Sequence, residues 1–190
     1  MRRRFSILTV TAALAFMAHA AFADTGKFPL VAEGEYFSIY APDEVDMGDL
    51  LARLNYRHFL QVDSFLEARE DDPRGLLSKT LDALYLQASD VLGIHIYSFH
   101  GDLEVFPDKI ALHIFFKDFL NQDLQERSYY LHEANTIYIS YKDLTLGMLG
   151  HEIAHAIISN YFVVLPSAQV QEILSGYVEY SLRKQTMTLP

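Results

Sequence analysis

Apolar and polar residues follow two different periods along the chain and predict a mixture of helices and strands. Apolar residues three and four positions apart, as on a helix with one buried face, occur at 47–70, 76–93, 143–161 and 168–184. Short apolar or alternating runs, typical of strands, occur at 34–42, 94–99, 109–116 and 136–141. A turn is expected at 71–75 and a short helix at 117–127. Because the helices precede, interrupt and follow the strands, the predicted class is α+β.

The first 23 residues have the pattern of a secretory signal peptide. Three arginines are followed by an apolar stretch at 5–17 and then by small residues, among them Ala20 and Ala23. Cleavage is expected after Ala20 or Ala23, with Ala23 favoured. The other interpretation is an uncleaved membrane anchor, but the apolar stretch is short for a bilayer span. The expected product is one domain, 24–190, in the periplasm or secreted, with no membrane attachment after cleavage.

Charge and cysteine content limit the partners and the chemistry that are expected for this protein. The chain carries 25 acidic and 15 basic residues, a formal net charge of −10. This charge disfavours nucleic acid and anionic membranes as partners. With no cysteine, the protein has neither disulfides nor a cysteine nucleophile, so its stability rests on core burial and on any metal ion that it binds.

The segment 150–162, GHEIAHAIISNYF, contains the strongest chemical signal. On a helix, His151 and His155 lie one turn apart on the same face, so both imidazoles can reach one metal ion. Glu152 stands beside the first histidine, where it can take a proton from a water bound to that ion. Burying these groups in an apolar helix without a shared partner would cost on the order of several kcal/mol. The motif therefore predicts a zinc site.

A catalytic zinc has three protein ligands, so a third must come from elsewhere in the chain. The metzincin extension of the motif is absent, because Ile158 and Tyr161 occupy its Gly and His positions. The last predicted helix offers Glu172 and Glu179, two turns apart on nearly the same face. From spacing alone, either can complete the site.

The segment 135–182 resembles the catalytic core of gluzincin metallopeptidases. In that family an edge strand leads into the H-E-x-x-H helix, and a later helix supplies a glutamate ligand. This glutamate is often followed by a small residue three positions on and an aromatic residue five positions on. Ser175 and Tyr177 stand in this register after Glu172, whereas the bulky Leu182 is three positions after Glu179. The resemblance therefore favours Glu172 as the third ligand.

The resemblance implies a zincin-like fold and a zinc-dependent peptidase. His151, His155 and Glu172 would bind Zn²⁺, and Glu152 would be the catalytic general base. The fold would be a small mixed sheet whose edge strand packs on the H-E-x-x-H helix, with the third ligand on the C-terminal helix. A peptide or protein substrate would pair with the strand at 136–141 if that strand lies at the edge.

The segment also departs from the family pattern. No further Tyr or His stands well downstream of Glu172 to stabilise an oxyanion, so a stabiliser is expected upstream or from Tyr161 or Tyr177. Gly176 replaces a carboxylate that often orients a ligand histidine. The leading expectation is an exported zinc metallopeptidase. The alternative is a non-catalytic exported zinc-binding or interaction protein with the same fold.

Overall fold

The computed structural model describes residues 28–55, 57–58, 72–119, 121 and 123–189. The predicted signal peptide and most of the second half of the predicted helix at 47–70 lie outside these ranges. The strands are β1 (Leu30–Glu33), β2 (Phe37–Tyr40), β3 (Gly101–Phe106), β4 (Ser128–Leu131) and β5 (Thr136–Ser140). The α-helices are α2 (Met47–Arg53), α4 (Pro73–Leu92), α5 (Lys109–Phe119), α6 (Leu146–Tyr161) and α7 (Ala168–Gln185).

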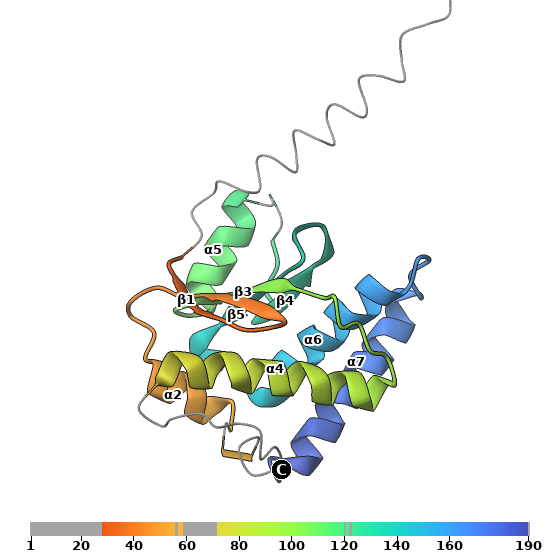
Figure 1. The fold of residues 1–190 in the computed structure, drawn as a ribbon. Helices are drawn as coiled ribbons and strands as arrows, with labels where there is room; N and C mark the ends of the chain where they lie inside the picture. The colour runs from red at the N-terminus through yellow and green to blue at the C-terminus, as the bar shows by residue number, and fades with distance from the viewer. Residues whose placement is uncertain (1–27, 56, 59–71, 120, 122, 190) are drawn as a thin grey trace, which may run out of the picture.

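The five strands form one mixed sheet in the order β1-β2-β3-β5-β4 (Figure 1). The central strands β2, β3 and β5 are parallel, and β1 and β4 pair antiparallel on the two sides. The predicted α+β class and small mixed sheet are confirmed. The predicted strand at 136–141 is present as β5, but its expected place at the edge is wrong. β5 lies between β3 and β4, and β4 is the edge strand that packs on α6.

Helices cover both faces of the sheet (Figure 1). Helix α5 packs on β3 and β5 from one side, while α4 and α6 pack on the other and α7 packs against α6. Alternate residues of β5 pack on opposite sides of the sheet, because successive side chains of a strand point to opposite faces. Ile137 and Ile139 join the main core with α4 and α6. Tyr138 joins a smaller core with Phe116 of α5.

The boundaries of the long helices follow from capping residues. Asp72 accepts a hydrogen bond from the Gly75 backbone N–H at 3.0 Å, and Pro73 opens α4. Gly93 ends α4 in the left-handed conformation, φ 67°. Thr145 caps α6 by accepting from the Met148 N–H at 3.2 Å. The helices predicted at 76–93 and 143–161 are confirmed. The predicted turn at 71–75 is wrong, because residues 73–75 form the first turn of α4.

Four other predictions differ from the structure. The predicted strand at 109–116 belongs to helix α5, which Asp108 caps by accepting from the Ala111 N–H at 3.0 Å. The predicted strand at 94–99 is a loop, and β3 begins only at Gly101. In the segment 117–127 the described residues after Phe119 are not helical. The helix predicted at 47–70 is interrupted after Arg53, where Asn55 has φ 51°.

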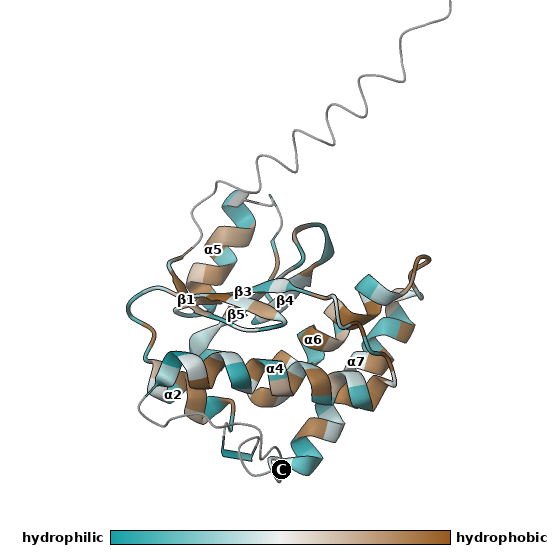
Figure 2. Cartoon of the chain, in the orientation of Figure 1, coloured by the Kyte–Doolittle hydropathy of each residue, from teal (hydrophilic) through white to brown (hydrophobic). Residues whose placement is uncertain are grey.

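The last helix, predicted at 168–184, is confirmed as α7, but its apolar residues do not all face the core. Val178 and Leu182 are buried against α6, whereas Val170, Ile173 and Tyr177 are exposed. The apolar connector before α7 is exposed as well (Figure 2).

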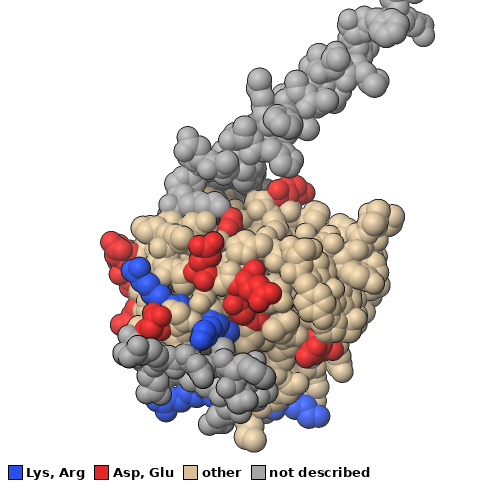
Figure 3. All heavy atoms as spheres, in the orientation of Figure 1, with Lys and Arg blue, Asp and Glu red and all other residues tan. Residues whose placement is uncertain are grey.

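Acidic side chains predominate over basic ones on the face drawn in Figure 3. Within the described part of the chain, no helix is long and apolar enough to cross a membrane.

Candidate metal centre

Helix α6 lies at the centre of the domain, in contact with α4, α7, β4 and β5. Ile153 and Ile157 face the main core and are fully buried. His151 and His155 lie on the side of α6 that faces α7 and are half-buried. The two helices approach closely because α6 has Gly150 where the Leu182 side chain of α7 packs; a Cβ at Gly150 would overlap that leucine. The close approach brings residues of α7 within reach of both imidazoles.

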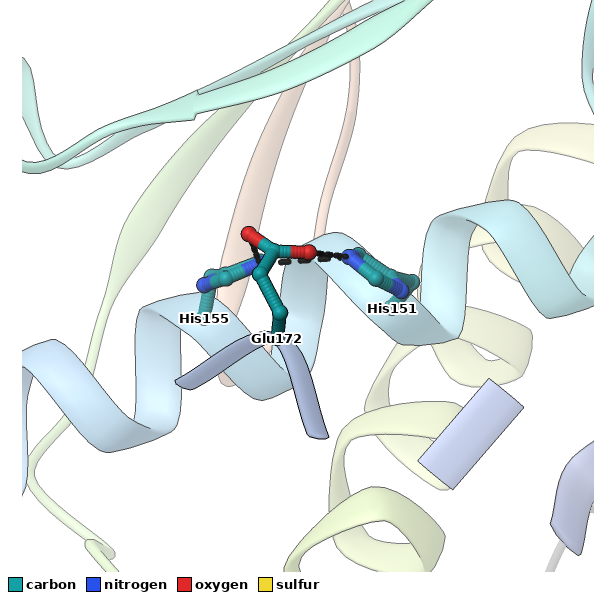
Figure 4. A group of neighbouring side chains, drawn as sticks. All are labelled: His151, His155 and Glu172. Carbon is teal, nitrogen blue, oxygen red and sulfur yellow. Dashed lines mark hydrogen bonds and ion pairs between the residues drawn. The ribbon is translucent and has the colours of Figure 1, made fainter. Parts of the chain in front are cut away.

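Three side chains converge on one point between the two helices (Figure 4). The Nε2 atoms of His151 and His155 are 3.2 Å apart. Glu172 of α7 lies against both, with Oε2 3.5 Å from His151 Nε2 and Oε1 3.3 Å from His155 Nε2. Each of the three offers a ligand atom, and these atoms lie within 4.8 Å of one another. The structure therefore brings together the three residues that the sequence predicts as ligands.

The spacing of this trio fits a divalent metal ion. Tetrahedral ligands about 2.0–2.1 Å from a zinc ion lie about 3.3 Å from one another. The two Nε2 atoms, 3.2 Å apart, match this separation, and each lies 3.3 or 3.5 Å from a different carboxylate oxygen of Glu172. With a single oxygen of Glu172 as ligand, the three ligand atoms lie within 4.8 Å of one another. Two imidazoles and one carboxylate are ligands that zinc and neighbouring transition metals accept. The cluster can hold a metal ion, and its donor set alone does not fix which one.

The surroundings of His155 favour the neutral ring that a metal requires. The pKa of His155 is lowered, mainly because burial disfavours the charged imidazole and secondly because of the charge of His151. The carboxylate of Glu172 and the Gln171 side chain act in the opposite direction, because both favour the protonated ring. A histidine that stays neutral competes less with protons for the ion.

Glu152, the predicted general base, points towards β4 rather than into the trio. Its Oε1 accepts a hydrogen bond from Ser128 Oγ at 2.7 Å, and its Oε2 accepts one from the Tyr130 backbone N–H at 2.9 Å. The residue is only 7% exposed. Burial raises the pKa of its carboxyl group, against the lowering effect of the Ser128 hydrogen bond and of His151. A raised pKa makes this carboxylate a better proton acceptor near neutral pH.

Two clefts, of about 750 and 560 Å³, meet at the candidate site. Both are lined by His151, Glu152 and Glu172. The larger cleft continues past the first turn of α6 towards Arg183. The smaller one follows β4 towards Leu165. The trio thus stands in the middle of an extended depression.

Several groups around the site were not found from the sequence. Ser128 and the Tyr130 N–H were missed because β4 was not predicted, and their contact with Glu152 depends on how the sheet packs on α6. Glu179, which the resemblance disfavours as the third ligand, lies 3.6 Å from His151 Nδ1. Tyr161 and Tyr177, considered as oxyanion stabilisers, are 54% and 57% exposed, and neither lines the two clefts.

Comparison of the chain with protein-family models, with curated proteins and with solved structures found no match. The metal-site interpretation therefore rests on the geometry of His151, His155 and Glu172. The likeness to gluzincin metallopeptidases rests on the residues of the segment 135–182.

Proposed function

We propose that this protein is an exported zinc-dependent metallopeptidase with a zincin-like fold. His151, His155 and Glu172 bind the ion, and Glu152 is the general base. The observation that carries the proposal is the convergence of one ligand atom from each of the three residues, all within 4.8 Å of one another, across two separate helices. Export is inferred from the N-terminal sequence, which has the pattern of a signal peptide.

The chemistry divides between the ion and the side chains. Zinc bound at this site would supply Lewis-acid activation of water and of a substrate carbonyl. Glu152 follows the first ligand directly in the chain and lines both clefts. The hydrogen bonds from Ser128 and the Tyr130 N–H fix its carboxylate, and its remaining lone pairs can accept a proton. Its raised pKa supports this role.

A polypeptide is the substrate that fits the shape of the site. β4 is an edge strand of the sheet, and its residues Ser128, Tyr129 and Tyr130 line the smaller cleft. The Tyr130 N–H is taken by Glu152, so a peptide would pair with the other backbone groups that β4 turns away from β5. An extended peptide can add to such an edge. Because the clefts extend on both sides of the trio, a substrate polypeptide can continue past the site in both directions. This favours cleavage of internal peptide bonds.

Removal of metal is expected to abolish cleavage of an unfolded protein substrate, and added zinc is expected to restore it. The measurement is the release of fragments from a denatured, fluorescently labelled protein before chelation, after chelation and after zinc addition. Circular dichroism of the chelated sample provides the control for folding. Cleavage at an unchanged rate after complete metal removal would contradict a metallopeptidase.

One observation favours the alternative function, a non-catalytic exported zinc-binding or interaction protein. Both carboxylate oxygens of Glu152 already accept hydrogen bonds from β4. In that arrangement the residue fastens the edge strand to α6, a structural role that requires no turnover. The two functions make opposite predictions for Glu152→Gln, described in the Discussion.

A further inference from the structure

The first histidine of the trio has a second polar contact with α7. The Nδ1 atom of His151, on the other side of the ring from the trio, lies 3.6 Å from Glu179 Oε2. Glu172 and Glu179 therefore both act from one helix on the His151 imidazole of another.

Such contacts matter for a metal ligand because a neutral imidazole carries one proton on either of its two nitrogens. To offer a lone pair at Nε2, the ring must keep its proton on Nδ1. An acceptor at Nδ1 selects that form, fixes the ring orientation and makes Nε2 more basic. The Nε2 atoms of His151 and His155 are 3.2 Å apart. Two lone pairs at this distance require a cation or a proton between them.

The position of Glu179 is explained by the contact between α6 and α7. Gly147 lies one turn before His151, and a Cβ at this position would stand 3.1 Å from the Glu179 Cγ. The missing side chain lets Glu179 lie along α6. Arg183 Nη1 lies 3.4 Å from the Glu179 Oε1, which leaves Oε2 towards His151. The side chain of Glu179 is 34% exposed.

Glu179 also stands where the family resemblance leaves a gap. The position four residues after Glu172, which often carries an orienting carboxylate, is Gly176 and has no side chain. Glu179 lies seven residues after Glu172, two helical turns along the same face. Its carboxylate reaches the first histidine from there. Within the described part of the chain, no residue forms a hydrogen bond to His151 Nδ1, so no other group competes with Glu179 for this nitrogen.

We infer that Glu179 of α7 orients the first histidine ligand, His151. It is a positioning residue. It holds the ring proton on Nδ1, away from the ion, and keeps Nε2 aimed at the ion, while Glu172 from the same helix supplies the third ligand. The inference rests on the metal site of the proposed function and is independent of whether the protein cleaves peptides.

Zinc affinity tests this inference without any activity assay. Glu179→Ala is expected to weaken zinc binding by about 10- to 100-fold, measured on the purified protein by competition with a chromogenic chelator. Glu179→Gln keeps a carbonyl acceptor but loses the charge, so its affinity should fall between wild type and Glu179→Ala. Glu133→Gln is the matched control, because it removes the same charge from a cleft-lining residue that does not contact either histidine.

The melting temperature of the metal-free variant separates positioning from general stability. If Glu179 acts through His151, metal-free Glu179→Ala should melt within a few degrees of metal-free wild type. Wild-type zinc affinity in this variant would overturn the inference and leave the metal centre standing. An equal loss of stability with and without zinc would also overturn it. Failure of folded wild type to bind zinc would instead overturn the metal centre itself.

Discussion

Replacing Glu152 with glutamine is expected to lower kcat/KM for peptide cleavage by about 10²- to 10⁴-fold, the usual contribution of a positioned general base. The amide cannot take the proton that the carboxylate accepts. Zinc content should not change, because the trio of ligands does not include Glu152. The measurement combines peptidase kinetics with metal analysis of the same preparation.

The fold should survive this change because glutamine can keep both contacts of Glu152 with β4. Its carbonyl oxygen can accept from the Tyr130 N–H, and its NH₂ group can donate to Ser128 Oγ. Glu126→Gln is the matched control. Glu126 also lines both clefts, but it is exposed and stands outside the trio. A Glu152→Gln protein that cleaves as fast as wild type would contradict the catalytic role of Glu152. The non-catalytic alternative predicts instead that neither protein cleaves and that the change leaves fold and zinc binding intact.

Gly150→Val is expected to have the largest effect on stability. The added side chain would overlap Leu182, which is fully buried between the helices. Overpacking of this kind costs about 1–3 kcal/mol, and each kcal/mol lowers the melting temperature of a chain of this size by about 2–4 °C. Because α7 must move away from α6, Glu172 should also leave the histidines, so zinc affinity should fall with stability.

Gly176→Val provides the control on the neighbouring helix. A Cβ at Gly176 would meet no atom within 4 Å. Stability should therefore change by less than about 0.5 kcal/mol, as for most substitutions that disturb no packing. Thermal denaturation of both variants, with and without zinc, measures the difference. If Gly150→Val melts at the wild-type temperature, the close helix contact does not determine the position of Glu172.

Local sequence signals were sufficient to predict an element when residues at its own ends mark where it begins or stops. Helices α4 and α6 combine an apolar period with a capping side chain, and Gly93 marks the end of the first. The placement of His151 and His155 on one face needs only the geometry of a single helix. The pattern at 109–116 was ambiguous, because a short apolar run fits a strand or a buried helix equally well. Leu112 and Phe116, four residues apart and fully buried, identify the helix only once the sheet beneath them is known.

The remaining features depend on contacts between distant segments. The choice of Glu172 over Glu179 required the family resemblance, and the contact of Glu179 with His151 arises from the close approach of α7 at Gly147. The interior position of β5 depends on β4, a four-residue strand with little periodic signal. The exposure of Ile173 and Tyr177 has a similar cause, since α7 buries only the face around Val178 and Leu182. Packing of this kind is set by the whole domain and not by local periodicity.

The central claim is that one ion is held by His151, His155 and Glu172, and metal content tests it most directly. Elemental analysis of purified wild-type protein, expressed in zinc-containing medium and never exposed to chelator, should find about one zinc ion per chain, as for a single three-ligand site. Glu172→Ala should retain only a small fraction of that zinc, while Glu133→Gln should retain all of it. Folded wild-type protein without a transition metal, or Glu172→Ala with its full complement, would contradict the account.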